Sequence, residues 1–182
     1  MVDKKEKNNS KISPHSIEAE EAVLGCMLLN KNAVSKSIQI LNENCFYKIS
    51  NSTIFGVMVN LFEKNQTIDT ISVCEELTKI NQIDNIGGAY FISGLANNAP
   101  TAENVDYYSQ IVKEKYILRT IISVASKIST SAYDNQEDVI NILDGAEQEL
   151  FSLSQDAERG KFKEIEPLLH TVLDNWGNRK SG

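Results

Sequence analysis

The sequence predicts an all-α protein made of a globular helical head, a long antiparallel helical hairpin and a short amphipathic linker helix. The 182 residues include only three Pro and nine Gly, a composition that favours long helices. Apolar residues recur at helical spacing, with a heptad-like pattern after residue 102. The predicted organisation is a disordered arm over 1–13, a head of about five to six short helices over 14–101, the hairpin over 102–154, a flexible linker over 155–166 and the linker helix over 167–180.

The first helix of the head is predicted to begin at Ser13-Pro14, since serine caps helices and proline suits the first turn. Its body, AVLGCMLL, is apolar almost all round, so we expect it at the centre of the core. Gly25 inside it costs about 1 kcal/mol of helix propensity. The close approach of another helix would explain that cost.

Further helices of the head are predicted over about 33–42 and 50–64, where apolar residues recur on one face. A fourth helix begins at Asp69-Thr70, and either residue can cap it. The apolar face of this fourth helix is predicted to hold Ile71, Cys74 and Leu77.

The pair Gly87-Gly88 precedes a short helix that is predicted to end near residues 97–100. A phosphate cradle at this pair is the alternative interpretation. It has weak support, because a phosphate-binding loop needs more glycines or a Lys-Ser/Thr pair at fixed spacing.

A heptad-like stripe marks the first hairpin helix, predicted over about 103–132. A turn at Asp134-Asn135 and a second helix over about 137–154 complete an antiparallel hairpin. The stripe of the first helix consists of Ile111, Leu118 and Ala125 with the companion series Ile121 and Ile128. The apolar positions of the second helix are Val139, Leu143, Ala146, Leu150 and Leu153.

The first hairpin helix has more apolar surface than one neighbour would cover. Ile117, Ile122 and Val124 lie beside the main stripe. A helix that is apolar on more than one face is usually buried on more than one side. One side can meet the second hairpin helix, and the other would meet the head or a second chain. Packing within one chain and an interface between chains both remain open at this point.

The predicted linker helix begins at Pro167 after a polar stretch. It is narrow and amphipathic, and it resembles a helix that docks into a groove elsewhere. Trp176 is the expected anchor, because Trp is common at interface hot spots. The predicted docking residues are Leu169, Val172, Leu173 and Trp176.

Charge and cysteine content indicate a cytoplasmic protein that acts through protein surfaces. The net charge is −7, without a basic stripe of the kind that grips DNA phosphates, so we expect no strong nucleic-acid binding. Cys26, Cys45 and Cys74 form neither a disulfide framework nor a zinc signature. The opening MVDKKEKNNSK is no signal peptide, and no apolar run approaches the ~20 residues that span a bilayer.

Catalytic patterns are absent from the sequence. There is no G-x-x-x-x-G-K-S/T loop, and His15 and His170 accompany no nucleophile or metal-binding pattern. We therefore expect no catalytic residue, bound cofactor or metal, and no enzyme activity of this chain by itself.

The segment PHSIEAEEAVLGCMLL closely resembles the opening of the DnaB-type replicative DNA helicases. Further matches follow in the order of that family, from Ser13 to Trp176, and the ordered set is highly specific. These matches are Cys45-Phe46-Tyr47, Ile54-Phe55, Ile68-Asp69-Thr70, Glu76-Leu77, Gly87-Gly88-Ala89-Tyr90, Pro100-Thr101, Asn104, Tyr108, Ile111-Val112, Arg119, Glu147 and Leu150-Phe151.

The resemblance implies an amino-terminal piece of such a helicase that stops before the RecA-like ATPase motor, where ATP and Mg²⁺ would bind. In that family the heads and hairpins pair, and the pairs form a trimer of dimers, the collar of a hexameric ring. The collar contacts a DnaG-type primase and, in some members, the helicase loader. The linker helix packs on the neighbouring motor. The residues expected near interfaces are Ile117, Arg119, Ile122, Val124 and Tyr133.

One departure from the family pattern precedes the Ile-Phe pair of the third helix. Many relatives carry a His-Arg pair there, whereas this chain has Asn51 and Ser52, which we interpret as a local surface adaptation. The alternative function is a stand-alone phage or plasmid adaptor that imitates the collar and titrates primase or loader.

Overall fold

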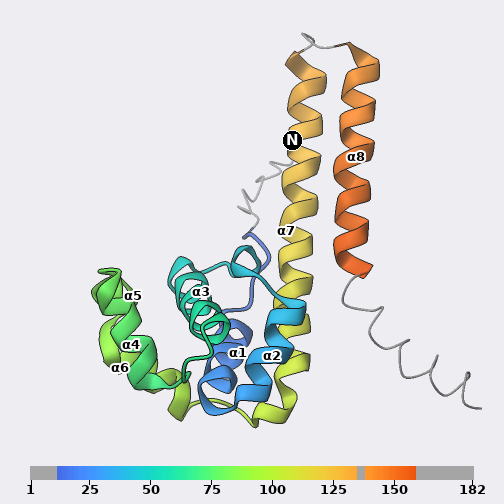
Figure 1. The fold of residues 1–182 in the computed structure, drawn as a ribbon. Coiled ribbons are helices and arrows are strands. Elements are labelled where there is room, and N and C mark those ends of the chain that lie inside the picture. Colours follow the sequence, from blue (N-terminus) through green and yellow to red (C-terminus); the bar gives the residue numbers. More distant parts are fainter. Residues whose placement is uncertain (1–11, 135–137, 159–182) are drawn as a thin grey trace, which may run out of the picture.

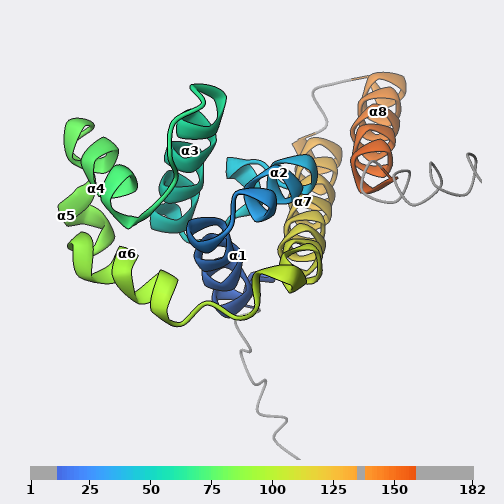
Figure 2. The ribbon, with the colours of Figure 1, turned by 60° about the horizontal axis from the view of Figure 1, so that its bottom comes forward.

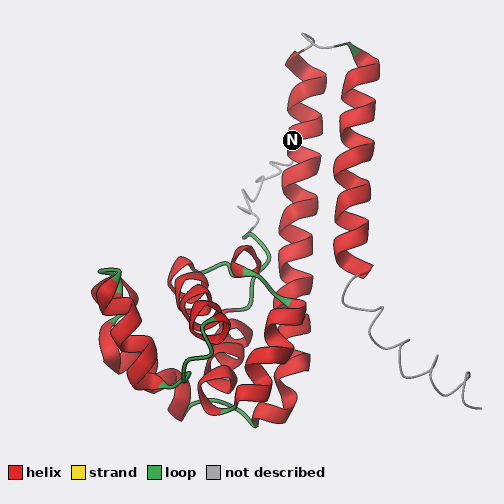
Figure 3. Ribbon diagram, viewed as in Figure 1, coloured by secondary structure: helices red, strands yellow, loops and turns green. Residues whose placement is uncertain are grey.

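The computed structural model describes residues 12–134 and 138–158. Within these ranges all regular structure is helical (Figure 3), which confirms the predicted all-α class. The head contains α1 (Ile17–Leu29), α2 (Lys31–Ile40), the 3-10 turn η1 (Glu43–Cys45), α3 (Ile49–Glu63), α4 (Thr70–Lys79), α5 (Ile83–Ile86), α6 (Gly88–Asn97) and the 3-10 turn η2 (Ala102–Asn104). The hairpin consists of α7 (Val105–Asp134) and α8 (Val139–Glu158).

Helix α1 occupies the centre of the head, as its apolar sequence predicts. It contacts α2, α3, α6 and α7, and Figure 2 shows it with α2 and α7 on one side and α3 and α6 on the other. Eight of its thirteen residues are buried. A helix with neighbours on several sides has no broad polar face to expose, which explains why its apolar residues show no single stripe.

The start of α1 differs from the prediction. Ser16, not Ser13, caps the helix, and its hydroxyl accepts a hydrogen bond from the backbone N–H of Ala19 at 3.3 Å. Pro14 precedes the helix instead of opening it, and its carbonyl oxygen accepts a hydrogen bond from Arg119 on α7. The local cap at Ser16 therefore sets the start of α1 three residues after the predicted position.

Gly25 marks the close approach of a second helix, as predicted. A Cβ atom at this position would collide with the backbone carbonyl of Leu95 on α6 and lie 2.8 Å from the Cβ of Ala99. The backbones of α1 and α6 can approach this closely only because Gly25 has no side chain.

The helices α3 and α4 end in the same manner. Asn65 and Asn81 adopt left-handed conformations with φ of 53° and 55°. In each turn the following glutamine N–H bonds back to a helix carbonyl, from Gln66 to Leu61 and from Gln82 to Leu77, both at 2.9 Å. These are Schellman-type ends, and the second leads into α5, which the apolar pattern did not predict.

The predicted apolar face of α4 is only partly correct. Asp69 caps the helix as expected, accepting from the N–H of Ser72 at 2.8 Å. Leu77 is buried and Cys74 is half-buried, but Ile71 is 73 % exposed. The core side of α4 holds Val73 instead, because α3, α5 and α6 cover one side of α4.

The hairpin projects from the head. The first half of α7 packs on the head, while its second half and α8 run side by side and antiparallel beyond it (Figures 1 and 2). Residues 155–158, predicted to open a flexible linker, continue α8. The remainder of that linker, the predicted linker helix with its docking residues Leu169, Val172, Leu173 and Trp176, and arm residues 1–11 lie outside the described residues.

Candidate interaction surfaces

Arg119 joins the hairpin to the head. Its Nη1 donates to the carbonyl oxygen of Pro14 at 2.9 Å, and its Nη2 donates to that of Cys45 at 2.7 Å. The guanidinium carbon lies 5.6 Å from the ring centre of Tyr47 and 6.0 Å from that of Tyr116. A planar guanidinium can bond to carbonyls and stack on rings at once. Arg119, expected near an interface between chains, is thus engaged within its own chain.

Tyr47 extends this junction to the segment before α1. Its ring stacks on the ring of His15 with a centroid distance of 4.3 Å and an interplanar angle of 9°. His15 also contacts the carbonyl oxygen of Ser13 through Nδ1 at 2.6 Å. Tyr47 and His15 therefore help to hold the incoming chain against the head.

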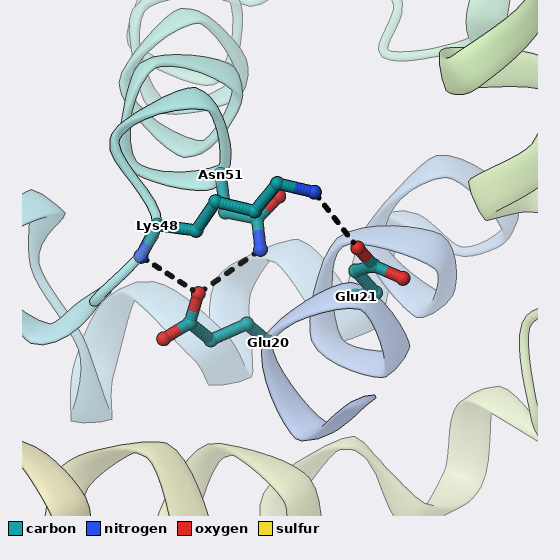
Figure 4. Close-up of polar contacts among 4 residues, drawn as sticks. All are labelled: Glu20, Glu21, Lys48 and Asn51. Atoms are coloured by element: carbon teal, nitrogen blue, oxygen red, sulfur yellow. Dashed lines mark hydrogen bonds and ion pairs between the residues drawn. The ribbon is translucent and has the colours of Figure 1, made fainter. Parts of the chain in front are cut away.

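Glu20 is a buried carboxylate that organises the loop before α3 (Figure 4). Its Oε1 accepts from the N–H of Tyr47 at 2.7 Å, and its Oε2 accepts from the N–H of Lys48 at 3.3 Å and from the amide of Asn51 at 3.0 Å. Burial of a carboxylate is tolerated when donors satisfy it. The residue pattern offered no sign of this role, because acidic residues early in a helix are ordinary.

The Asn51–Ser52 departure is not purely a surface feature, so that prediction was wrong for Asn51. Asn51 is fully buried and its side-chain amide bonds to Glu20. Ser52 bonds through its hydroxyl to the carbonyl oxygen of Glu43 at 2.9 Å. The third helix turns Asn51 inward because α3 packs on α1.

A second ion pair lies beside this network. Lys48 contacts Glu21 at 3.2 Å (Figure 4), and its Nζ lies 4.6 Å from the ring centre of Phe91. Glu21 and Phe91 line a pocket of about 400 Å³ between α1 and α6. The pocket is therefore bordered by carboxylates and aromatic rings. Its lining residues are Glu18, Glu21, Ala22, Tyr90, Phe91, Gly94, Leu95 and Asn98.

The seam, the contact between α7 and α8, contains only some of the residues of the predicted stripes, among them Ile128, Ala146 and Leu153. Lys127 pairs with Glu149 at 3.3 Å across the seam, so these two residues lie at the same height in the antiparallel helices. One turn further from the hairpin tip, Val124 and Leu153 are the buried residues. A small cleft in the seam is lined by Lys127, Ile128, Ser131, Asn141, Ile142, Gly145, Ala146 and Glu149.

Most of the predicted apolar stripes face solvent. On α8 only Ala146 and Leu153 of the stripe take part in the seam. The exposed large apolar residues of the hairpin are Tyr107, Leu118, Ile121, Ile122, Tyr133, Val139, Ile140, Leu143, Leu150 and Phe151. Such a concentration of exposed apolar side chains is typical of an interaction surface.

The predicted interface residues have different environments. Ile122 and Tyr133 are 55 % and 87 % exposed, and Ile117 is half-buried. Val124 is only 5 % exposed, because the seam with α8 covers it within the same chain. The heptad spacing could not distinguish these environments. Apolar residues occur on more than one side of α7, and spacing alone does not show which side another helix covers.

Two of the three cysteines lie in surroundings that disfavour a reactive thiol. Burial raises the pKa of the Cys26 and Cys74 thiols, which disfavours the nucleophilic thiolate. Among residues 12–134 and 138–158, no cluster of His, Cys, Asp and Glu has the arrangement of a metal site. None of the helices in these two ranges is both long and apolar enough to cross a lipid bilayer.

A family model for the DnaB-like helicase N terminal domain matches residues 12–114, which is more than half of the chain. The chain belongs to this family. The DnaB-like domain here is 36 % identical over 167 residues to the replicative DNA helicase DnaB of Geobacillus stearothermophilus and 32 % identical to the replicative DNA helicase DnaC of Bacillus subtilis. In both comparisons the match covers 92 % of this chain and 37 % of the relative.

The fold agrees with a solved member of the same family. The crystal structure of the N-terminal domain of DnaB helicase from Mycobacterium tuberculosis superposes with a TM-score of 0.74 and 29 % identity, covering 78 % of this chain and 99 % of that one. The match to an N-terminal domain accords with the absence of a phosphate-binding loop from the 182 residues. The matches to replicative helicases do not favour the stand-alone adaptor.

Proposed function

We propose that this DnaB-like domain assembles the collar of a replicative, ATP-dependent DNA helicase ring and docks primase and, in some assemblies, the helicase loader. The observation that carries the proposal is the exposed apolar surface of the hairpin, together with membership of the family. ATP and Mg²⁺ would belong to the motor part of the longer protein. No residue of this domain is assigned to either.

Five of the exposed large apolar residues of the two hairpin helices lie on one face. On α7, Leu118 and Ile121 lie on average about a quarter turn from the buried seam residue Val124, and on α8, Leu143 and Leu150 lie about a quarter turn from the buried seam residue Leu153, at 3.6 residues per turn. Because the helices are antiparallel, equal rotations from the seam bring both sets to the same side. We call this surface, formed by Leu118, Ile121, Val139, Leu143 and Leu150, the hairpin face.

The hairpin face suits a second copy of the chain. Burying one Leu or Ile side chain stabilises an assembly by roughly 1.5–3 kcal/mol, and a two-fold axis would bury the same residues from both copies. Such pairing would convert the exposed hairpin into a four-helix arrangement. This is the contact that would begin the proposed trimer of dimers.

The pocket between α1 and α6 is a candidate contact for primase in addition to the hairpin. Glu18 and Glu21 provide negative charge, while Tyr90 and Phe91 provide rings. Carboxylates beside aromatic rings suit a Lys or Arg side chain of a partner protein, through ion pairing and cation–π contact. Tyr90 is almost fully exposed and would be an anchor of the kind found at hot spots.

Sedimentation velocity at tens of micromolar tests the self-assembly. The chain should form dimers or larger species, and Leu143→Glu should shift it to monomer because a carboxylate would enter an apolar contact. Ile49→Glu is the matched control, since Ile49 is 83 % exposed on the head. A strictly monomeric wild type would contradict the proposal. So would an Ile49→Glu control that loses dimer formation as completely as Leu143→Glu.

Calorimetric titration with a bacterial primase tests the docking. Glu18→Lys and Tyr90→Ala should each weaken binding by about ten-fold or more, the effect of losing a hot-spot residue. Ile71→Ala, an exposed residue outside this pocket, should leave the affinity unchanged. Undiminished binding by both pocket variants would remove the pocket from the proposal.

A further inference from the structure

The side chain of Lys48 extends from the start of α3 to the pocket between α1 and α6. Its Nζ contacts Oε1 of Glu21 on α1 at 3.2 Å and lies 4.6 Å from the ring centre of Phe91 on α6. Figure 4 shows the side chain reaching towards Glu21. Glu21 and Phe91 both line the pocket. The ammonium of Lys48 therefore contacts one residue from each of the two helices that form the pocket.

The backbone of Lys48 is held independently of its side chain. The buried carboxylate of Glu20 accepts a hydrogen bond from the N–H of Lys48 at 3.3 Å and another from the amide of Asn51 at 3.0 Å. By contrast, the side chains of Lys48 and Glu21 are 40 % and 35 % exposed, and ion pairs of such exposure are weak. The ammonium can therefore leave the pocket while the loop before α3 keeps its conformation.

The other carboxylate and the other ring of the pocket are open to a partner. Glu18 lies on the same side of α1 as Glu21, three residues earlier, and makes no ion pair within residues 12–134 and 138–158. Tyr90 is 90 % exposed, and no cation of these two ranges lies over its ring. The pocket thus combines an occupied carboxylate and ring with an open carboxylate and ring.

We infer that Lys48 is a built-in competitor for the basic side chain that the pocket takes from a partner protein. The inference rests on the proposed docking at this pocket. Lys48 shows which chemistry the pocket holds, because its ammonium lies beside a carboxylate and an aromatic ring. An incoming Lys or Arg must replace this ammonium at Glu21 and Phe91. The positive charge of Lys48 also repels the incoming side chain until Lys48 leaves.

The competition makes the pocket selective. A group attached to the same chain competes at an effective concentration on the order of millimolar. An isolated basic side chain offers only the contacts that Lys48 already makes, so it displaces Lys48 poorly below such concentrations. A partner that also contacts Glu18 or Tyr90 gains more than is lost with Lys48. Lys48 therefore restricts the pocket to partners that make several contacts at once.

NMR titration of the 182-residue chain with N-acetylarginine amide tests the competition. This probe carries one guanidinium and none of the other contacts of a partner protein. The ring signals of Tyr90 and Phe91 report its binding. Lys48→Met should bind the probe about three- to ten-fold more tightly than the wild type, because a weak ion pair and one cation–π contact no longer compete. Methionine keeps the backbone N–H that bonds to Glu20.

Two further substitutions separate competition from a general effect of charge. Lys36→Met removes the same charge from a similarly exposed ion pair, with Asp106 at 2.6 Å. Lys36 belongs to α2, on the other side of α1 from α6 (Figure 2), so the affinity for the probe should stay within about two-fold of the wild type. Lys48→Arg should also stay within about two-fold, because a guanidinium pairs with carboxylates and stacks on rings as well.

Equal affinity of Lys48→Met and the wild type for the probe, or no binding by either, would overturn the inference. An equal gain in Lys36→Met would overturn it too. If Glu18→Lys and Tyr90→Ala weaken primase binding but Lys48→Met gains no affinity for the probe, the competition is rejected and the docking stands. If Lys48→Met gains affinity for the probe but the pocket variants bind primase normally, the competition stands and primase is not the partner of this pocket.

Discussion

Arg119 on α7 donates a hydrogen bond to the backbone carbonyl oxygen of Cys45 at 2.7 Å, across 74 residues of sequence. The same guanidinium bonds to Pro14, 105 residues away. One side chain therefore ties the hairpin to the start of the head and to the loop before α3. The direction in which the hairpin surfaces point depends on this junction.

We expect Arg119→Lys to lower the free energy of unfolding by about 1–3 kcal/mol, because an ammonium cannot reproduce the two-directional bonding and stacking of a guanidinium. Urea unfolding followed by circular dichroism measures this. Lys127→Ala is the control, since its pair with Glu149 is exposed and such pairs contribute little. Similar losses in the two variants would contradict the special role of Arg119.

Glu20→Gln should destabilise the head by about 2–4 kcal/mol, because the amide nitrogen cannot accept one of the three hydrogen bonds that the carboxylate receives. The neighbouring change Glu21→Gln removes only the partly exposed pair with Lys48 and should cost less than about 1 kcal/mol. Thermal and urea unfolding of the two variants compare them directly. An equal cost would show that the buried network around Glu20 is unimportant.

Gly25→Ala should destabilise the protein even though alanine is the better helix former. The added Cβ would collide with Leu95 and Ala99, and overpacking of this kind typically costs about 1–3 kcal/mol. Gly94→Ala on α6 meets no atom within 4 Å and should stabilise by about 0.5–1 kcal/mol. Opposite signs in urea unfolding are the expected result; a stabilising Gly25→Ala would refute the close approach of α1 and α6.

The stability of α4 should depend on pH through Asp69. The backbone N–H of Ser72 holds the pKa of the Asp69 carboxyl below its ordinary value. Because the pKa is lower in the folded state, the ionised Asp69 carboxylate stabilises the folded protein above the unfolded pKa. This stabilisation is lost as the pH falls through the folded pKa. The free energy of unfolding of Asp69→Asn should therefore depend less steeply on pH in the acidic range than that of the wild type. An unchanged pH dependence in this range would contradict this assignment.

The helical class, the central position of α1, the close approach at Gly25 and the presence of a hairpin could all be predicted from the sequence. These features follow from helix propensity and from the spacing of apolar residues, both of which depend on residues close to one another in the sequence. The resemblance to the replicative helicases was also visible in the sequence, because it rests on the order of motifs along the chain.

Which apolar residues are buried could not be predicted from the sequence, because burial depends on the packing of helices against one another. Val124 and Leu143 are both apolar residues on hairpin helices, yet Val124 lies in the seam and Leu143 is exposed. The burial of Glu20, the inward position of Asn51 and the bonds of Arg119 likewise depend on partners 27 to 105 residues away. Helical periodicity fixes which residues share a side of a helix, but the side that meets a neighbour is set by contacts distant in sequence.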